Sequence, residues 1–293
     1  MDLGTKPLLG VIGGSGLYDM AGLQDVQRVA VETPWGSPSD DLVVGTLEGT
    51  RTAFIPRHGR GHRFTPTEVP YQANLWALKK LGCEFVVSVS ATGSMKEEIA
   101  PGHLVVVDQF IDRTTSRART FFGNGIVGHV GFADPVCPTL RQILLRAARA
   151  TGKPTHDGGT YVCIEGPTFS TRAESLLFRS WGVAVVGMTN LPEARLAREA
   201  GLSYATLALA TDYDCWHESE EAVSVEAVVS SLKKNVAAAQ ETVRGLAKEL
   251  SSPNAPKRSP FSDIALGAIM TAQDAAPAET RRRLRLLIGD VLG

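Results

Sequence analysis

The chain has 293 residues, and its 30 Lys and Arg against 31 Asp and Glu give a formal net charge of −1. This balance excludes a nucleic-acid binder that neutralises many phosphates, because such proteins carry a basic excess. No run approaches the roughly eighteen consecutive apolar residues of a membrane helix, and the N-terminus has no apolar signal core. The 4 cysteines lie far apart with no CxxC pair, which favours reduced thiols over a zinc site. We therefore expect a cytoplasmic globular protein that contacts neither nucleic acid nor membrane.

In chain order, short β-rich runs fill the first 56 residues, and helical patterns then alternate with near-continuous Val, Ile and Ala runs. This alternation is typical of an α/β protein whose mixed, mainly parallel central sheet is flanked by helices. The predicted strands cover 7–14, 26–33, 42–49, 51–56, 85–94, 103–110, 160–166, 183–189 and 204–213. The predicted helices cover 69–82, 139–152, 171–182, 192–201 and 224–250.

Two of these helices have marked N-termini. Thr171 and Glu174 have the spacing of a capping box, and Pro192 stands where a first helical residue belongs, with Asn190 as its cap. After the last long helix, residues 251–260 are predicted to be a surface linker and 262–292 a helical tail. We therefore expect one α/β domain over residues 1–250, with residues 251–293 forming a linker and C-terminal helical extension packed on the same domain.

A glycine-rich turn, GVIGGSGLY at 10–18, directly follows a predicted strand. Exposed backbone N–H groups and the Ser15 hydroxyl can cradle a phosphate in such a turn. A dinucleotide fingerprint is excluded, because the third glycine position holds Asp19. A tight turn without a ligand is an equally good interpretation of this segment alone.

A basic cluster, PRHGRGHRF at 56–64, follows another predicted strand in a chain that is neutral overall. Arg57, His58, Arg60, His62 and Arg63 within so few residues indicate an anion site. A metal site at the two histidines is disfavoured, because glycines interrupt any helix that would align them and no third ligand follows nearby. The alternative is a solvated basic loop.

The hydroxyl-rich segment SVSATGSM at 88–95 ends a predicted buried strand. Ligands of open α/β sheets bind beyond the carboxyl ends of strands, so this segment is a candidate binding loop. A Ser/Thr-rich turn that caps the next element explains the same residues.

Two carboxylates, Asp212 and Asp214, lie two positions apart at the end of the last predicted strand, in ATDYDCWH. If strand geometry persists, both point to one face, where one pKa is raised and the pair can act as a general acid. An exposed turn or helix cap is the alternative. No GxSxG or GxxxxGKS motif occurs, which disfavours a serine hydrolase or a nucleoside triphosphatase.

Taken together and in this order, these segments resemble the trimeric purine nucleoside phosphorylases, and among them the S-methyl-5'-thioadenosine phosphorylase family. The similarity extends over about residues 8–232. It is carried by GVIGGSGLYD, TPWGSPSD, PRHGRGH, YQANLWALK, ATGSMKEEIAPG, DQFIDRT, IEGPTFSTRAES, GMTNLPEARLAREAG and ATDYDCWHESEEAVSV. The resemblance implies a nucleoside phosphorylase fold and a transferase that cleaves the N-glycosidic bond of a purine nucleoside with inorganic phosphate.

The resemblance also implies the site residues. The expected phosphate ligands are Ser15, Arg57, His58, Ser90, the backbone of Ala91, and Thr189. The expected nucleoside contacts are Phe169, Ser170, Asp212 and Asp214 at the base, Met188 at the ribose, Val223 and Val225 at the 5' group, and His129 from a neighbouring subunit. A homotrimer is therefore expected, because a monomer has an incomplete site.

The mechanism expected for such an enzyme follows from where charge develops. As the glycosidic bond breaks, the sugar becomes cationic and the purine anionic, so catalysis needs an anion beneath C1' and a proton for N7. Phosphate supplies the anion. We expect Asp212 to supply the proton, with Asp214 tuning it or contacting the 6-amino group. No metal or organic cofactor is expected. Inorganic phosphate is a co-substrate.

Two positions favour a 6-amino purine. Related inosine and guanosine phosphorylases have Glu at the position of Ser170, in FET instead of FST, and Asn at the position of Asp212. The expected reaction is cleavage of S-methyl-5'-thioadenosine to adenine and 5-methylthioribose 1-phosphate, in purine and methionine salvage. The alternatives are a methylthioinosine or inosine/guanosine phosphorylase, a hydrolytic nucleosidase, and a non-catalytic nucleotide-binding module.

Overall fold

The computed structural model describes residues 5–14, 17, 20–217 and 225–292, with residues 225–234 described by their backbone. One mixed sheet runs in the order β2-β3-β4-β1-β5-β10-β9-β7, while β11 pairs with β5 and β6, and β6 pairs with β8. The strands are β1 Leu9–Gly13, β2 Gln24–Val29, β3 Leu42–Leu47, β4 Thr50–Pro56, β5 Phe85–Ser94, β6 Leu104–Val106, β7 Gln109–Arg113, β8 Thr155–Asp157, β9 Thr160–Ile164, β10 Val185–Gly187 and β11 Ser203–Asp212.

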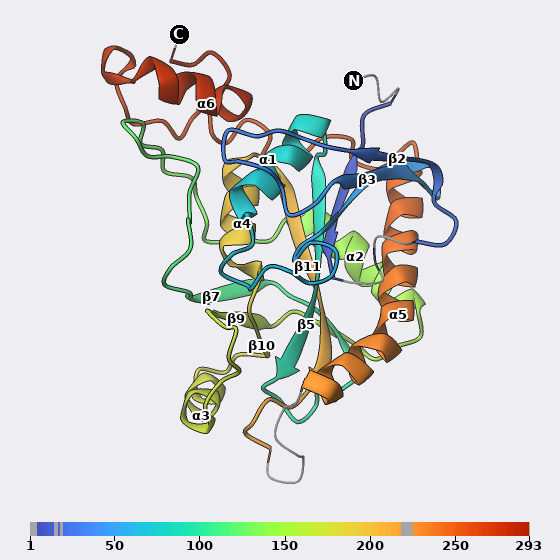
Figure 1. Cartoon of the computed structure of the whole chain (residues 1–293). Helices are drawn as coiled ribbons and strands as arrows, with labels where there is room; N and C mark the ends of the chain where they lie inside the picture. Colours follow the sequence, from blue (N-terminus) through green and yellow to red (C-terminus); the bar gives the residue numbers. More distant parts are fainter. Residues whose placement is uncertain (1–4, 15–16, 18–19, 218–224, 293) are drawn as a thin grey trace.

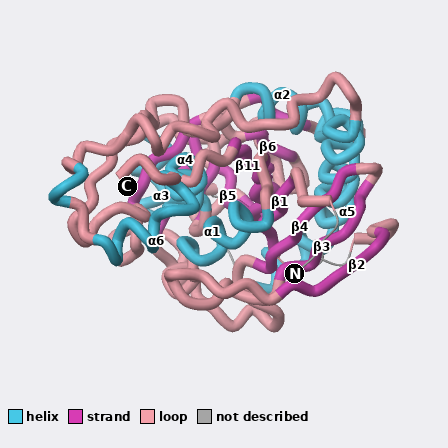
Figure 2. The backbone as a smooth tube through the Cα atoms, turned by 90° about the horizontal axis from the view of Figure 1, so that it is seen from above, coloured by secondary structure: helices cyan, strands magenta, loops and turns pink. Residues whose placement is uncertain are grey.

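Helices cover both faces of this sheet (Figures 1 and 2). They are α1 Tyr71–Leu81, α2 Pro138–Ala150, α3 Arg172–Ser180, α4 Asn190–Glu199, α5 Val225–Ser251 and α6 Ala278–Ile288, with a short 3-10 helix at Gln273–Ala275. One core cluster packs α1 and α4 against one face of the sheet, and a second packs α2 and α5 on the other face. Helix α6 stands away from the sheet (Figure 1), and its buried side chains extend the first cluster. The predicted α/β architecture with a mainly parallel mixed sheet is therefore confirmed.

Local signals explain several helix ends. Thr171 caps α3 as expected: its side chain accepts from the backbone N–H of Glu174, whose carboxylate accepts from the backbone N–H of Thr171. Gly82 ends α1 in the left-handed conformation with φ 103°. The predicted cap at Asn190 is wrong, because that side chain points inward and donates to Ser88 Oγ and Tyr204 Oη.

The structure differs from the prediction at three other places. The predicted strand at 103–110 is divided between two strands with different partners. Strand β6 pairs with β11 and β8, whereas β7 pairs with β9. Strand β8 was not predicted. The tail is helical only over α6 and the short 3-10 helix Gln273–Ala275. Before them, successive turns between Ser259 and Ala268 lead into a bridge between Gly128 and Ile269.

The pairing of β5 creates the site. Its first half pairs with β1 up to Ser88, and its end pairs with β10 at Gly93 and Ser94. Between these two pairings β5 changes neighbours, while β11 follows it throughout. Strands β1 and β10 therefore separate from each other beside Ser90. Such a switch point opens a crevice at the carboxyl ends of the parallel strands.

Two further expectations concern membranes and thiols. Within the described part of the chain, no helix is long and apolar enough to cross a membrane. All four cysteines are free; Cys215 is partly exposed and the other three are buried, in agreement with the predicted reduced thiols.

Candidate active site

A cavity of about 280 Å³ lies where β5 changes neighbours. Its walls come from the ends of several strands and from α5. The lining residues are Gly14, Leu17, Arg57, His58, His62, Pro66, Val89, Ser90, Ala91, Thr92, Gly93, Ile164, Phe169, Ser170, Val186, Gly187, Met188, Thr189, Leu209, Thr211, Asp212, Asp214, Val236 and Ala239. The cavity thus unites the basic cluster, the hydroxyl-rich segment and the paired carboxylates.

Arg57 forms part of one wall directly after β4. Its backbone N–H donates to Gly13 O at 3.0 Å, which ties the basic cluster to the glycine-rich turn. Its side chain is 3% exposed and forms a two-point ion pair with Glu193. Burial alone would lower the pKa of Arg57, but the charge and hydrogen bonds of Glu193 raise it above the ordinary value. The guanidinium is therefore a permanent cation in the wall.

His58 beside it is neutral near pH 7. Burial, followed by the charge of Arg57, lowers the pKa of His58 to about 4. Its Nδ1 lies 2.8 Å from Phe64 O and must carry the proton, because a carbonyl oxygen only accepts. This assignment leaves Nε2 as a hydrogen-bond acceptor, which can pair with the hydroxyl of a hydrogen phosphate ion.

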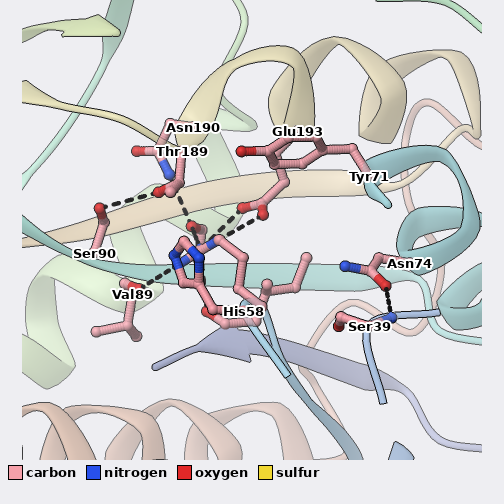
Figure 3. A network of polar contacts seen from close by, with 12 residues as sticks. Ser39, His58, Tyr71, Asn74, Val89, Ser90, Thr189, Asn190 and Glu193 are labelled. Carbon is pink, nitrogen blue, oxygen red and sulfur yellow. Dashed lines mark hydrogen bonds and ion pairs between the residues drawn. The ribbon is translucent and has the colours of Figure 1, made fainter. Parts of the chain in front are cut away.

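Hydroxyl groups from two strand ends meet at the same end of the cavity. Ser90 Oγ lies 3.3 Å from Thr189 Oγ1 and 3.4 Å from Tyr161 Oη. Figure 3 shows Ser90 and Thr189 facing each other close to the His58 ring. A basic side chain and two hydroxyls converging in a buried pocket form a suitable cradle for a small oxyanion.

Asp212 and Asp214 lie together in the cavity wall. The expectation that a continuing strand places them on one face is wrong, because β11 shifts register between Ala210 and Asp212 and Asp214 has φ 54°. A turn brings them together instead: the backbone N–H of Asp214 donates to Asp212 Oδ1 at 2.8 Å. Burial raises the pKa of both carboxyls, whereas the sequence predicted a raised pKa for only one of them. The pair suits proton donation.

Phe169 and Ser170 lie on the loop between β9 and α3 at the cavity wall. Phe169 is 43% exposed although it is a large apolar residue, so its ring offers an open stacking surface. Ser170 Oγ is buried and makes no hydrogen bond of normal geometry within the described residues. Its hydroxyl also interacts with the Asp214 carboxyl and lowers the pKa of that group, so Ser170 belongs to the same polar end of the cavity as the carboxyl pair.

The structure places only some of the remaining predicted residues at the cavity. Met188 and Ala91 line it. Ser15 and Val223 lie outside the described residues, as does the side chain of Val225. His129 is exposed and is absent from the cavity lining of its own chain.

The sequence analysis missed two parts of the site. Glu193 was not predicted to pair with Arg57, which is 136 positions away in the chain. Val236 and Ala239 add apolar wall from α5, and their spacing of three on a predicted helix was a usable signal that they share a face.

A metal centre finds no support in the described part of the chain. No group of three or more His, Cys, Asp or Glu side chains there has an arrangement that can hold a metal ion. His58 and His62 stack with ring centroids 4.3 Å apart.

Sequence comparison relates this chain to known proteins. The model of the Phosphorylase superfamily matches residues 8–248. The S-methyl-5'-thioadenosine phosphorylase of Geobacter sulfurreducens is 57% identical over 285 residues, covering 97% of this chain and 99% of that protein. The protein of the same name from Synechocystis is 51% identical over 288 residues, covering 96% of this chain and 86% of the other.

Solved structures agree with these matches. A methylthioadenosine phosphorylase from an antarctic soil metagenomic library superposes with a TM-score of 0.90 at 48% identity, over 97% of this chain and 99% of that one. A methylthioadenosine phosphorylase from Schistosoma mansoni, in complex with adenine, superposes with a TM-score of 0.77 at 40% identity, over 83% of this chain and 91% of that one.

Proposed function

The chain belongs to the Phosphorylase superfamily, and we propose that it cleaves the N-glycosidic bond of S-methyl-5'-thioadenosine with inorganic phosphate. The products are adenine and 5-methylthioribose 1-phosphate, so the enzyme is a pentosyltransferase. The observation that carries this proposal is one cavity that joins an oxyanion cradle at Arg57, Ser90 and Thr189 to a carboxyl pair at Asp212 and Asp214.

The cradle is proposed to hold the attacking phosphate. Arg57 and the hydroxyls of Ser90 and Thr189 donate to its oxygens, the backbone of Ala91 joins them, and neutral His58 accepts from its hydroxyl. Ser15 completes the set by resemblance. An anion held there stabilises the cationic sugar that develops as the glycosidic bond breaks.

The carboxyl pair is proposed to handle the purine. Asp212 donates its proton to N7, and the raised pKa of its buried carboxyl keeps more of it protonated than an exposed aspartate would be. Asp214 contacts the 6-amino group, and its charge helps to raise the pKa of Asp212. Phe169 packs against the base, and Met188 contacts the ribose.

Ser170 supports the choice of a 6-amino purine. A glutamate here would accept from the N1–H of a 6-oxopurine, whereas adenine has no such hydrogen. The Ser170 hydroxyl, buried without a hydrogen bond of normal geometry in the described part of the chain, can instead donate to a ring nitrogen. The Schistosoma mansoni relative, solved in complex with adenine, is consistent with this choice.

The 5' group is proposed to meet a pocket that a neighbouring subunit completes. His129 is exposed, and Val127 and Met270 beside it are large apolar residues at 48% and 70% exposure. A backbone hydrogen bond from Met270 to Val127 O joins these two segments. A second exposed apolar surface, Leu176 and Leu177 of α3, lies just beyond the Phe169 loop.

These two surfaces suit a head-to-tail contact between copies of the chain. When one patch of each subunit binds a different patch of the next subunit, the subunits are related by a rotation and can close into a ring. In the proposed ring of three, His129 of each subunit lies at the next subunit's cavity. We therefore assign a homotrimer, in which residues 1–250 form the phosphorylase domain and residues 251–293 pack on it. Val223 and Val225 complete the 5' pocket by resemblance. Inorganic phosphate is the only co-reactant, and no metal or organic cofactor takes part.

Comparing two nucleosides tests the proposed substrate. In phosphate buffer, adenine release from methylthioadenosine should be faster than hypoxanthine release from methylthioinosine. Faster cleavage of methylthioinosine would identify a 6-oxopurine enzyme of the same superfamily, and cleavage of neither would favour a nucleotide-binding module.

A further inference from the structure

Glu193 lies behind the cavity wall that Arg57 helps to form, and the two side chains are almost fully enclosed. The two side chains are 3% and 1% exposed. Arg57 Nε donates to Glu193 Oε2 at 2.9 Å, and Nη2 donates to Oε1 at 3.2 Å. Two parallel hydrogen bonds fix the plane of the guanidinium as well as its position.

Other contacts complete the hold on Arg57. Nη2 also donates to Ser88 Oγ at 2.6 Å, and Nη1 donates to Val89 O at 3.1 Å. Among the described residues, these bonds leave one N–H group of Nη1 without a partner. This Nη1–H group is therefore the one with which Arg57 can donate a hydrogen bond to a ligand in the cavity, and the other contacts of the guanidinium fix its direction.

Glu193 itself is held in place. Tyr204 Oη donates to its Oε1 at 2.8 Å, and Asn190 Nδ2 donates to both Tyr204 Oη and Ser88 Oγ. Asn190 follows Thr189, and Ser88 lies two positions before Ser90. Figure 3 shows Glu193, Asn190 and Thr189 at one side of this network, with Ser90 and Val89 nearby. The network thus couples all three strand ends that supply the cradle.

We propose that Glu193 is a positioning residue for phosphate: it touches no substrate, but it orients Arg57 and keeps that guanidinium in register with Ser90 and Thr189. This inference rests on the proposed function and deepens it, because it assigns the orientation of the anion to a carboxylate behind the wall.

Two other roles for Glu193 predict different results. If it mainly neutralises Arg57, removing its charge leaves an uncompensated cation and phosphate binds more tightly. If it mainly supports the fold, removing its charge affects phosphate and nucleoside equally. A positioning role predicts weaker phosphate binding with little change for the nucleoside.

The test measures phosphate binding and turnover in Glu193→Gln. A Gln side chain keeps the shape but replaces one carboxylate oxygen with an NH2 donor, so it cannot accept the two parallel bonds from Arg57. We expect the Kd and KM for inorganic phosphate to rise about tenfold or more, with the KM for methylthioadenosine changed less than about twofold. Calorimetry and the phosphate-dependent rise in Tm give Kd without any need for turnover.

Two further variants keep the test decisive. Tyr204→Phe removes one restraint on Glu193 and should raise the phosphate Kd in the same direction by a smaller factor, about threefold. Glu199→Gln is the matched control: its carboxylate is also buried on α4, but it binds Phe121 N and Thr120 Oγ1, away from the cavity. Its phosphate Kd should equal that of wild type.

The outcomes separate this inference from the proposed function. Unchanged or tighter phosphate binding in Glu193→Gln, or equal losses for phosphate and nucleoside, would overturn the positioning role. If Glu193→Gln does not fold, Tyr204→Phe decides: an unchanged phosphate Kd overturns the inference. Weaker phosphate binding in the variants, in a protein that cleaves no methylthioadenosine, would uphold the positioning role and reject the proposed function.

Discussion

The backbone N–H of Asp214 donates to Oδ1 of Asp212 at 2.8 Å, while Thr211 Oγ1 lies 2.6 Å from Oδ2. The Asp212 carboxyl is thus held at both oxygens, although burial raises its pKa. When Oδ2 is protonated, it can donate a hydrogen bond to Thr211 Oγ1, while the Thr211 hydroxyl donates to Thr92 O at 3.2 Å. Both protonation states of Asp212 therefore have hydrogen-bond partners, as a general acid requires.

Asp212→Asn removes the proposed proton donor and keeps the shape of the side chain. We expect kcat with methylthioadenosine to fall by about two orders of magnitude or more, with little change in phosphate affinity. Because a general acid must be protonated, the proposed role of Asp212 predicts that wild-type kcat falls as pH rises through its raised pKa and that the variant lacks this dependence. Unchanged turnover would remove Asp212 from the mechanism.

Gly93 explains why the carboxyl pair fits beside β5. A Cβ atom there would lie 3.0 Å from Asp212 Oδ1 and 3.2 Å from Asp214 Cβ. We expect Gly93→Ala to displace the pair, raising the KM for nucleoside and lowering kcat while phosphate binding persists. Gly267→Ala is the control, since a Cβ there meets nothing within 4 Å. Wild-type kinetics in Gly93→Ala would contradict the assigned base site.

Glu199 provides a test of pH-dependent stability. Burial raises its pKa to about 7, from an ordinary value of 4.5. Between these values the folded protein holds a proton that the unfolded chain has lost, so this group makes stability fall as pH rises from 4.5 to 7. Glu199→Gln should remove this pH dependence. Relative to wild type, its free energy of unfolding should therefore increase by up to about 3 kcal/mol between pH 4.5 and pH 8. Urea unfolding at several pH values measures this; a pH-independent difference would contradict it.

The exposed face of α3 tests the proposed trimer. Light scattering should report three copies for wild type, and Leu177→Glu should dissociate them and raise the KM for methylthioadenosine, because the His129 contact is lost. Val26→Glu is the control, since Val26 is equally exposed but lies on β2, far from α3 (Figure 1). A Leu177→Glu variant that stays trimeric would exclude α3 from the interface.

Local sequence signals predicted much of this fold. The alternation of apolar runs with helical patterns gave the α/β architecture, and the capping box at Thr171 is confirmed. Arg57 and His58 were predicted to form an anion site because positive charge is clustered there at a strand end, and Ser90 to lie in a binding loop because ligands bind beyond the carboxyl ends of strands. All of them line the cavity.

Long-range pairing was not predictable in the same way. The apolar run at 103–110 reads as one strand, but its two halves pair with different partners. Asn190 has the residue type of a helix cap, yet its amide joins the buried network at Tyr204. Glu193 lies in the first turn of α4, and only the fold brings it to Arg57. These contacts depend on residues distant in the chain, which local patterns do not encode.

The most direct test of the central claim measures adenine release from methylthioadenosine with and without inorganic phosphate, together with the sugar product. The account predicts release only with phosphate and one 5-methylthioribose 1-phosphate for each adenine. Release at the same rate without phosphate, with free methylthioribose as the product, would contradict it.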